Sequence, residues 1–291
     1  FVCEQPEEVR MRPFTTLMIE SNGAIARVTL NRPDRRNAFD GQMATELREA
    51  FEDLAHDPSI RGIVLAAAGS VFCAGADLQW MQSDGPALET PAMRDAHHLL
   101  RMFRAIDEFP CPVIARVQGS AFGGGLGLLA VCDIVVAAEE ATFALSEPRL
   151  GLIPAVIAPF LLHKAGESFL RRYGLTGETF CASTAQRYNL AHDVVPQSNL
   201  DDRITELSDA LLQLAPCATK ESKLLFNRMR ALSDKERLAL GPEYNARARC
   251  APEAAEGLQA FIEKRPPAWA KPRERKPQEA TTSDDVVVRH R

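Results

Sequence analysis

Glu147 is the first residue in this sequence whose setting suggests chemistry. It follows a short apolar run in the segment Thr-Phe-Ala-Leu-Ser-Glu-Pro-Arg-Leu-Gly, and Pro148 keeps it out of a helix interior. A carboxylate at the edge of an apolar wall has a raised pKa, which suits general acid–base catalysis near neutral pH. The alternative is a surface glutamate paired with Arg149, and this segment alone favours that alternative.

Two segments of small residues could offer backbone N–H groups to an oxyanion. The first reads Val-Phe-Cys-Ala-Gly-Ala-Asp-Leu and ends at Leu78; it is either a tight turn capped by Asp77 or an anion site near a helix N-terminus. The second contains Gly123, Gly124 and Gly125 in a row. Adjacent glycines indicate close packing of backbones or a ligand approaching the backbone. Neither the phosphate-loop motif nor the dinucleotide motif is present.

The surrounding pattern predicts strands and helices in alternation, which is typical of an α/β layered core. Asp40 is suited to cap a helix whose apolar residues begin at Met43. The predicted strands cover residues 15–20, 24–30, 63–68, 113–117 and 134–138, and a further helix covers 93–109. Four more predicted helices cover 200–215, 216–230, 234–248 and 252–264.

These patterns divide the chain into four parts. We expect an N-terminal extension at residues 1–12, the α/β core at 13–199, a helical region at 200–269 and a disordered tail at 270–291.

Composition excludes several classes of function. The chain has 291 residues, a net charge of −5 and a pI near 5.8, which argues against a dedicated nucleic-acid binder. No apolar run approaches the roughly 20 residues of a membrane helix. The 6 histidines show no metal-ligand spacing, and the 7 cysteines contain no C-x-x-C pair. We therefore expect no metal, no membrane association, free thiols and a cytoplasmic location.

Six segments in order resemble the crotonase superfamily, the enoyl-CoA hydratases and isomerases, from about Phe14 to Trp269. The matching segments are NRPDRRNAF, FCAGADL, VQGSAFGGG, CDIVVAA, FALSEPRLGLIP and GLQAFIEKR. The resemblance implies a crotonase fold, in which repeated ββα units form a superhelical core. It also implies a C-terminal helical region that builds homotrimers, or hexamers as dimers of trimers.

The resemblance also assigns roles to residues of the site. The backbone N–H groups of Ala76 and Gly124 would form an oxyanion hole for the thioester carbonyl, and Glu147 would be one of two catalytic glutamates. Coenzyme A, as part of the substrate, would be bound by Arg35, Arg36, Ala74, Asp77, Leu78 and Gln79, with Phe261 and Lys264 reaching the coenzyme A of a neighbouring subunit.

Several of these positions have a structural alternative. Arg35 and Arg36 are equally consistent with solvated surface charge, and Phe261 and Lys264 with helix packing and a surface lysine. Trp80 and Met81 could line an acyl pocket, although large apolar residues are more often found in the core.

The sequence departs from the family where the second glutamate would stand, because that position is Gly127. The neighbouring segments resemble bacterial hydratases of 3-methylglutaconyl-CoA and isohexenylglutaconyl-CoA, whose substrates carry a β-branch and a second carboxylate. We expect a glutamate at position 127 to repel that carboxylate, and Gly127 to leave room for the branch and to contribute to substrate binding.

The resemblance therefore implies an enoyl-CoA hydratase, a hydro-lyase of leucine or acyclic-terpene catabolism, that needs no metal or redox cofactor because the thioester activates its own substrate. The missing glutamate favours a Δ3,Δ2-enoyl-CoA isomerase as the alternative. A non-catalytic relative that binds coenzyme A or RNA is a second alternative, although the acidic balance weighs against RNA.

Overall fold

The computed structural model describes residues 13–81 and 91–270. The predicted N-terminal extension and all but the first residue of the predicted tail lie outside these described residues. Among the described helices, none is both long enough and apolar enough to cross a bilayer.

The larger sheet of the described chain has six strands in the order β1-β2-β3-β5-β7-β10. Strands β1 and β2 form an antiparallel hairpin that turns at Gly23, where φ is +68°, and the remaining neighbours are parallel. Every residue of β3 is buried, which explains its continuous apolar run. The strands are β1 Leu17–Asn22, β2 Ile25–Leu30, β3 Gly62–Ala67, β5 Val113–Val117, β7 Ile134–Ala138 and β10 Asp193–Val195.

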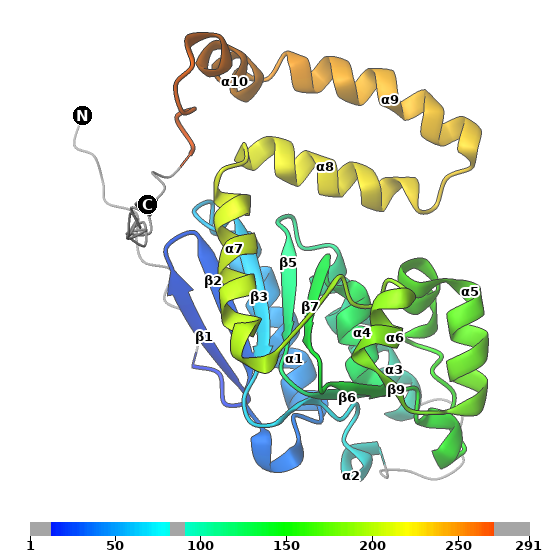
Figure 1. The fold of residues 1–291 in the computed structure, drawn as a ribbon. Coiled ribbons are helices and arrows are strands. Elements are labelled where there is room, and N and C mark those ends of the chain that lie inside the picture. Colours follow the sequence, from blue (N-terminus) through cyan, green and yellow to red (C-terminus); the bar gives the residue numbers. More distant parts are fainter. Residues whose placement is uncertain (1–12, 82–90, 271–291) are drawn as a thin grey trace, which may run out of the picture.

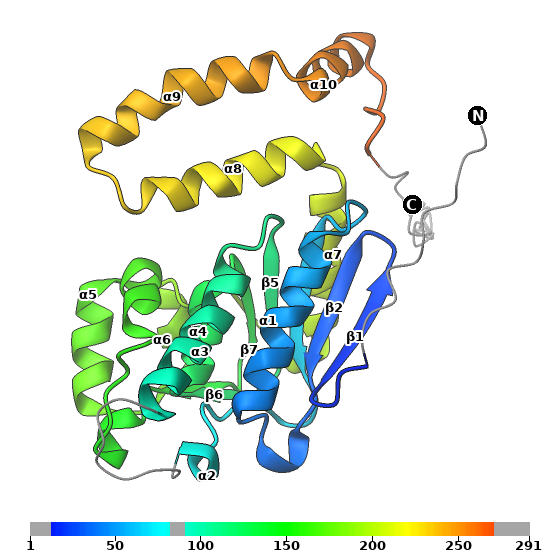
Figure 2. The same ribbon diagram turned by 180° about the vertical axis from the view of Figure 1, so that it is seen from behind.

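Helices cover both faces of this sheet, so the predicted α/β layers are confirmed. Helices α1 (Gly41–Ala55), α3 (Pro91–Asp107) and α4 (Gly124–Val131) lie on one face, and α7 (Leu200–Leu212) lies on the other (Figures 1 and 2). Asp40 caps α1 as predicted, because its side chain accepts a hydrogen bond from the Met43 N–H. The first helix of the predicted C-terminal region, α7, is therefore a layer of the core.

The smaller sheet carries the segments that the sequence singled out. Its strands run in the order β4-β6-β8-β9, and β4, β6 and β8 are parallel neighbours. Because the carboxyl ends of parallel strands meet at one edge, the segments that begin at Ala74, Gly123 and Leu145 leave the sheet side by side. The strands are β4 Val71–Cys73, β6 Ser120–Phe122, β8 Thr142–Ala144 and β9 Phe180–Cys181.

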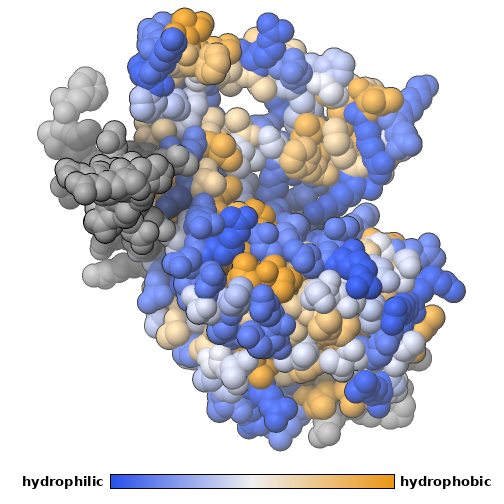
Figure 3. Space-filling view, in the orientation of Figure 1, coloured by the Kyte–Doolittle hydropathy of each residue, from blue (hydrophilic) through white to orange (hydrophobic). Residues whose placement is uncertain are grey.

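The last three helices form an arm that extends away from the core (Figure 1). They are α8 (Pro216–Met229), α9 (Asp234–Arg249) and α10 (Pro252–Glu263), close to their predicted bounds. Figure 3 shows hydrophobic side chains on the surface of this arm. The exposed large apolar residues of the arm are Leu224, Phe226, Leu238, Leu258, Phe261 and Ile262. The remaining described helices are α2 Leu78–Met81, α5 Ala158–Thr176 and α6 Ala182–Arg187, with 3₁₀ helices at Pro33–Arg35, Glu147–Leu150 and Gln197–Asn199.

A buried lysine attaches the arm to the core. Lys223 of α8 is only 7% exposed, and its ammonium donates to the Cys111 carbonyl at 3.0 Å and to Asp133 Oδ2 at 2.6 Å. Nearby, Arg230 pairs with Asp107 at 2.7 Å. Two ion pairs, Lys223–Asp133 and Arg230–Asp107, thus connect α8 to the core, and each depends on its charged partner.

We expect Lys223→Met to destabilise the protein by about 3 kcal/mol, because it removes the cation beside the half-buried Asp133 carboxylate. Chemical denaturation monitored by circular dichroism measures this loss. Lys235→Met, at an exposed position of α9, is the matched control and should change stability by less than about 0.5 kcal/mol. Equal stability of the two variants would contradict the role of Lys223.

Candidate active site

Glu147 is half-buried at the start of the 3₁₀ helix that follows β8. Its Oε1 atom lies 3.1 Å from the position that a Cβ atom on Gly123 would occupy. Its Oε2 atom is buried and has no hydrogen-bond partner among the described residues. Burial raises the pKa of this carboxyl. Arg149 makes no ion pair with Glu147 within the described chain, so the surface-pair alternative does not hold.

The Ala76 N–H group is directed away from its nearest strand neighbour. Ala76 forms an isolated parallel bridge with Phe39, in which Phe39 N–H donates to the Gly75 carbonyl and Asp77 N–H donates to the Phe39 carbonyl, each at 2.9 Å. In this pairing the N–H of Ala76 itself points to the other side. No acceptor for it occurs within residues 13–81 and 91–270.

The Gly124 N–H group is the first of helix α4, so it has no partner within the helix. A Cβ on Gly75 would lie only 3.2 Å from the Gly124 nitrogen, which shows how closely the two loop backbones approach. Two N–H donors without acceptors among the described residues therefore stand on adjacent backbones, and the helix dipole favours negative charge there.

Close packing explains why these positions are glycines. A Cβ on Gly124 would lie 2.4 Å from Phe39 Cζ, and a Cβ on Gly125 would lie 2.5 Å from the Cys73 carbonyl oxygen. Gly75 and Gly123 have positive φ of 91° and 50°. The close-packing interpretation is therefore correct for these segments, and this packing brings the two donors together; the anion-site interpretation stays a prediction.

The expectation that Gly127 leaves room for substrate is wrong. A Cβ at this position would lie 2.4 Å from Ile157 Cγ2 and 2.9 Å from two ring carbons of Phe103, and both side chains are buried. The Phe103 ring also packs edge-on against Phe39, with ring centroids 6.1 Å apart. Apolar side chains from α3 and from the start of α5 thus occupy the space that a side chain at position 127 would need. The sequence shows the small residue but not its neighbours.

Several predicted coenzyme A contacts gather around one groove of about 490 Å³. Arg35, Asp77 and Gln79 line it, and the Arg35 guanidinium donates to Gln79 Oε1 at 3.0 Å. The two oxygens of Asp77 are already engaged: Oδ2 lies 3.3 Å from Arg32 Nη2, and Oδ1 accepts from the Gln79 N–H at 3.0 Å. Asp77 therefore caps α2, as the structural alternative predicted.

The other predicted coenzyme A contacts do not line this groove but are at least partly exposed. Ala74 is half-buried, with its N–H donating to the Arg36 carbonyl at 3.0 Å, and the Arg36 side chain is exposed. Leu78 is exposed. The core alternative for Trp80 and Met81 is wrong, because Trp80 lines the groove and Met81 is 43% exposed.

Phe261 and Lys264 lie far from the other predicted residues. Figure 1 shows α10 at the opposite end of the molecule from α2 and β6, and Phe261 is 83% exposed. Within one chain they cannot join the site, so a contact with a neighbouring subunit stays a prediction.

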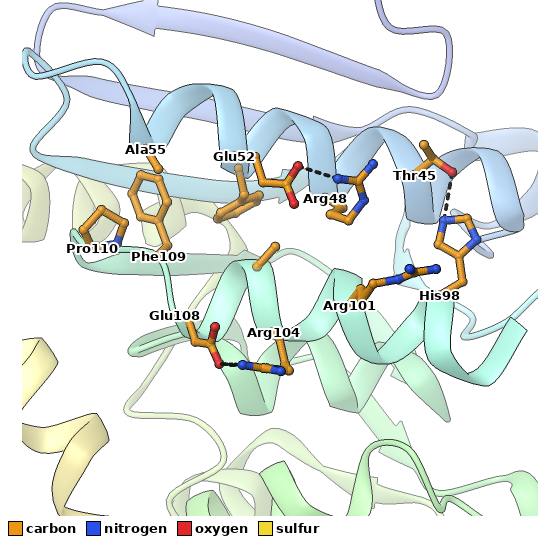
Figure 4. A pocket seen from close by; sticks show the side chains of 12 residues that line it. Thr45, Arg48, Glu52, Ala55, His98, Arg101, Arg104, Glu108, Phe109 and Pro110 are labelled. Atoms are coloured by element: carbon orange, nitrogen blue, oxygen red, sulfur yellow. Dashed lines mark hydrogen bonds and ion pairs between the residues drawn. The ribbon is translucent and has the colours of Figure 1, made fainter. Parts of the chain in front are cut away.

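A second cavity, of about 750 Å³, lies between α1 and α3 (Figure 4). Its polar edges carry a Thr45–His98 hydrogen bond and the pairs Arg48–Glu52 and Arg104–Glu108. None of the residues predicted for the site lines it.

The sequence did not single out Arg32 as a residue of the site. Its only signal in the sequence was its place in the Asn-Arg-Pro segment.

Comparisons with known proteins agree on one family. The profile described as enoyl-CoA hydratase/isomerase matches residues 20–272. An enoyl-CoA hydratase structure from Shewanella pealeana is 39% identical, with a TM-score of 0.83 over 88% of this chain and 96% of that one. The structure of AtuE from Pseudomonas aeruginosa is 33% identical, with a TM-score of 0.84 over 88% of this chain and all (100%) of that one.

A curated relative points the same way. The enoyl-CoA hydratase ACTT6 of Alternaria alternata is 35% identical over 234 residues, which cover 80% of this chain and 76% of the relative. With these likenesses, the predicted crotonase fold is confirmed.

We expect Gly127→Ala to destabilise the protein by about 1–3 kcal/mol, because the new methyl group overlaps Ile157 and Phe103. This loss opposes the helix preference for alanine over glycine of about 1 kcal/mol. Gly174→Ala is the matched control within a helix, since its nearest side-chain atoms are 3.6 Å away, and it should be neutral or stabilising.

Combining Gly127→Ala with Ile157→Ala removes the overlapping Cγ2 atom. In that background, Gly127→Ala should destabilise the protein less than it does alone, as a double-mutant cycle of denaturation free energies would measure. Strict additivity would show that the space beside Gly127 is open.

Proposed function

The chain belongs to the enoyl-CoA hydratase/isomerase family and has the activity of an enoyl-CoA hydratase; we propose that its substrate is a 2-enoyl-CoA with a β-branch and a second carboxylate, such as 3-methylglutaconyl-CoA or isohexenylglutaconyl-CoA. The observation that carries the catalytic part of this proposal is the position of Glu147. Its partly buried carboxylate stands beside Gly123, and the free Gly124 N–H follows directly in the chain.

In the proposed reaction Glu147 carries out both proton transfers. Its carboxylate removes a proton from water as the water oxygen bonds to the β-carbon, and the electron pair of the double bond moves toward the thioester oxygen. The protonated Glu147 then returns the proton to the α-carbon, so that the net change is addition of one water. A raised pKa suits both steps, because the group must accept and release a proton near neutral pH.

The N–H groups of Ala76 and Gly124 stabilise the enolate oxygen that forms between these steps. Removal of one such donor typically lowers the rate about 10²–10³-fold. Because both donors belong to the backbone, side-chain substitutions there act through the shape of the loops. No metal or redox group has a part in this proposal, since the thioester itself accepts the electron pair.

Within residues 13–81 and 91–270 no second carboxyl acts on Glu147, and this supports the proposed substrate class. Position 127 carries no charge, and Phe103 and Ile157 surround it with hydrocarbon. A carboxylate on the acyl chain therefore meets one anion fewer than it would in a two-glutamate site. The resemblance of the segments around Ala76, Gly124 and Glu147 to hydratases of branched glutaconyl thioesters supports the same class.

Isomerisation of a 3-enoyl-CoA to the conjugated 2-enoyl-CoA is the second candidate reaction. It needs one group that moves a proton between two carbons and a stabilised enolate oxygen. The carboxylate of Glu147, with hydrocarbon at position 127 where a second would stand, favours it. An inactive relative that only binds coenzyme A is disfavoured, because a half-buried carboxylate whose Oε2 atom has no partner among the described residues lowers stability and has no evident packing role.

The groove lined by Arg35 and Gln79 is the proposed site for coenzyme A, where a guanidinium group suits a phosphate. Assembly into trimers or hexamers is proposed because the arm exposes several large apolar side chains, including Phe261. In such an assembly Phe261 and Lys264 approach the coenzyme A of a neighbour. The four-part division of the chain and the cytoplasmic location also stay predictions.

We expect mass spectrometry to detect the gain of one water on 3-methylglutaconyl-CoA or isohexenylglutaconyl-CoA, with crotonyl-CoA turned over more slowly. Glu147→Gln is nearly isosteric and should lower this rate by at least about 10²-fold. Its folding should be unimpaired, because the amide removes a buried charge. Conversion of a 3-enoyl-CoA without gain of water would show that the second candidate reaction takes place, and faster turnover of crotonyl-CoA would contradict the substrate class.

The pH profile of kcat/KM should show the raised pKa of Glu147. The carboxylate form is the base, so activity falls as pH decreases through that pKa. The midpoint of this acid limb should lie above the value of about 4.3 for an ordinary glutamate. Crotonyl-CoA, which has no second carboxylate, is the control substrate, because its profile separates the enzyme carboxyl from that of the glutaconyl substrates. A midpoint at or below the ordinary value would contradict general-base catalysis by a buried Glu147.

A further inference from the structure

We propose that Arg32 is a positioning residue for the oxyanion hole: its guanidinium fixes the segment Ala38–Asp40 and the Asp77 carboxylate, and thereby aims the Ala76 N–H beside that of Gly124. This inference rests on the proposed role of these two N–H groups. Arg32 also lines the groove proposed for coenzyme A, but its guanidinium is engaged by acceptors of the protein itself, so the inference assigns it to catalysis through other residues.

The guanidinium of Arg32 is engaged on three sides. Nη1 donates to the Ala38 carbonyl at 2.6 Å, while Nη2 lies 3.0 Å from Asp40 Oδ2 and 3.3 Å from Asp77 Oδ2. The Arg32 side chain is 18% exposed and that of Asp77 is 12% exposed, so water screens these contacts only partly. A planar guanidinium can serve several fixed acceptors at once, which a lysine ammonium does less well.

The backbone of Arg32 is also held in place by hydrogen bonds. Its N–H donates to Asn37 Oδ1 at 2.9 Å, and its carbonyl accepts from the Asn37 N–H at 2.9 Å. Asn37 is fully buried, and its amide donates to the carbonyls of Ala68 and Val71, at 2.8 Å each. Arg32 is therefore fixed to the strand that leads into the Ala76 loop.

Arg32 is connected to Ala76 in two ways, through Asp77 and through Phe39. Asp77 follows Ala76 in the chain, so the ion pair between Asp77 and Arg32 restrains the peptide bond that joins Ala76 to Asp77. Phe39 pairs with Ala76 in the parallel bridge, and Phe39 lies between Ala38 and Asp40, both of which Arg32 contacts. Movement of either connection would turn the Ala76 N–H away from its present direction.

Arg32 is connected to Gly124 through the ring of Phe39. Phe39 Cζ lies 2.4 Å from where a Cβ on Gly124 would be, so the ring lies directly against the backbone of the second donor. Phe39 is also fully buried and packs against Phe103. Phe39 therefore contacts both donors, through its backbone on one side and its ring on the other, and Arg32 sets where Phe39 stands.

The charges make this arrangement depend on Arg32. The carboxylates of Asp40 and Asp77 both face Arg32 Nη2. Without the guanidinium they would repel each other, and this repulsion would separate the start of α1 from the Ala76 loop. A misplacement of about 1 Å at a catalytic group can lower the rate about 10²-fold.

The test compares Arg32→Met, Arg32→Lys and Asp77→Asn with the full-length wild-type chain. Kinetics on the best acyl-CoA substrate are combined with the absorbance of bound cinnamoyl-CoA, whose conjugated carbonyl shifts to longer wavelength when hydrogen bonds polarise it. Arg48→Met is the matched control, because Arg48 also pairs with two carboxylates on α1 but makes no contact with Phe39 or Asp77 among the described residues.

We expect Arg32→Met to lower kcat about 10–10²-fold with KM changed less than about 3-fold, and to lose most of the absorbance shift. Arg32→Lys should recover part of both, and Asp77→Asn should show a smaller loss of the same kind, which keeps the test informative if Arg32→Met does not fold. Arg48→Met should match the wild type in both measurements.

Two results would overturn the inference. If the Arg32 variants lose only thermal stability and keep kcat and the absorbance shift, Arg32 has a structural role alone. If the wild type itself shows no absorbance shift with bound cinnamoyl-CoA, the oxyanion hole is not formed by Ala76 and Gly124, and the proposed function fails together with the inference. The second result is distinguished from the first because it appears before any substitution is made.

Discussion

In the described part of the chain, the neighbouring backbone N–H groups of Ala76 and Gly124 have no acceptor, and most features of the proposed site follow from how this is achieved. A donor that is partly shielded from water and has no acceptor is unfavourable, so folded proteins leave one only where the surrounding structure gives it no alternative. Gly124 has none because it begins a helix, and Ala76 has none because its bridge to Phe39 uses the peptides on either side of it. Close contact between the loops then requires glycine at several neighbouring positions.

Of the carboxyl groups in the described part of the chain, that of Glu147 lies beside Gly123 and hence close to these donors. Glu147 is held by the 3₁₀ helix after β8, and burial alone raises its pKa. Where a second carboxylate would stand, the rings of Phe103 and Phe39 and the side chain of Ile157 pack against α4. The low polarity of this packing strengthens the hydrogen bonds that the donors can offer to an oxyanion, because less water competes for them.

The arm formed by α8, α9 and α10 differs from the core in where its polar and apolar side chains lie. Its attachment is polar, through Lys223 and Arg230, while its free surfaces carry large apolar side chains. A polar attachment is directional and fixes where the arm emerges, and exposed apolar area is suited to burial against another surface. The arm thus contributes little to the site of its own chain, whose residues all precede α5.

The sequence by itself determined the features that depend on consecutive residues. The alternation of strands and helices, the Asp40 cap, the glycine segments and the isolated Glu147 all came from local patterns, and the structure places them close to the predicted bounds. Only the tertiary structure decided what surrounds Gly127 and what Arg32 holds. Phe103 and Ile157 are distant from Gly127 in sequence, and Asp77 is distant from Arg32, so no local pattern specifies these pairs. They follow from the packing of three helices and two loops around one sheet edge, because a side chain's neighbours across a fold are set by how whole elements meet.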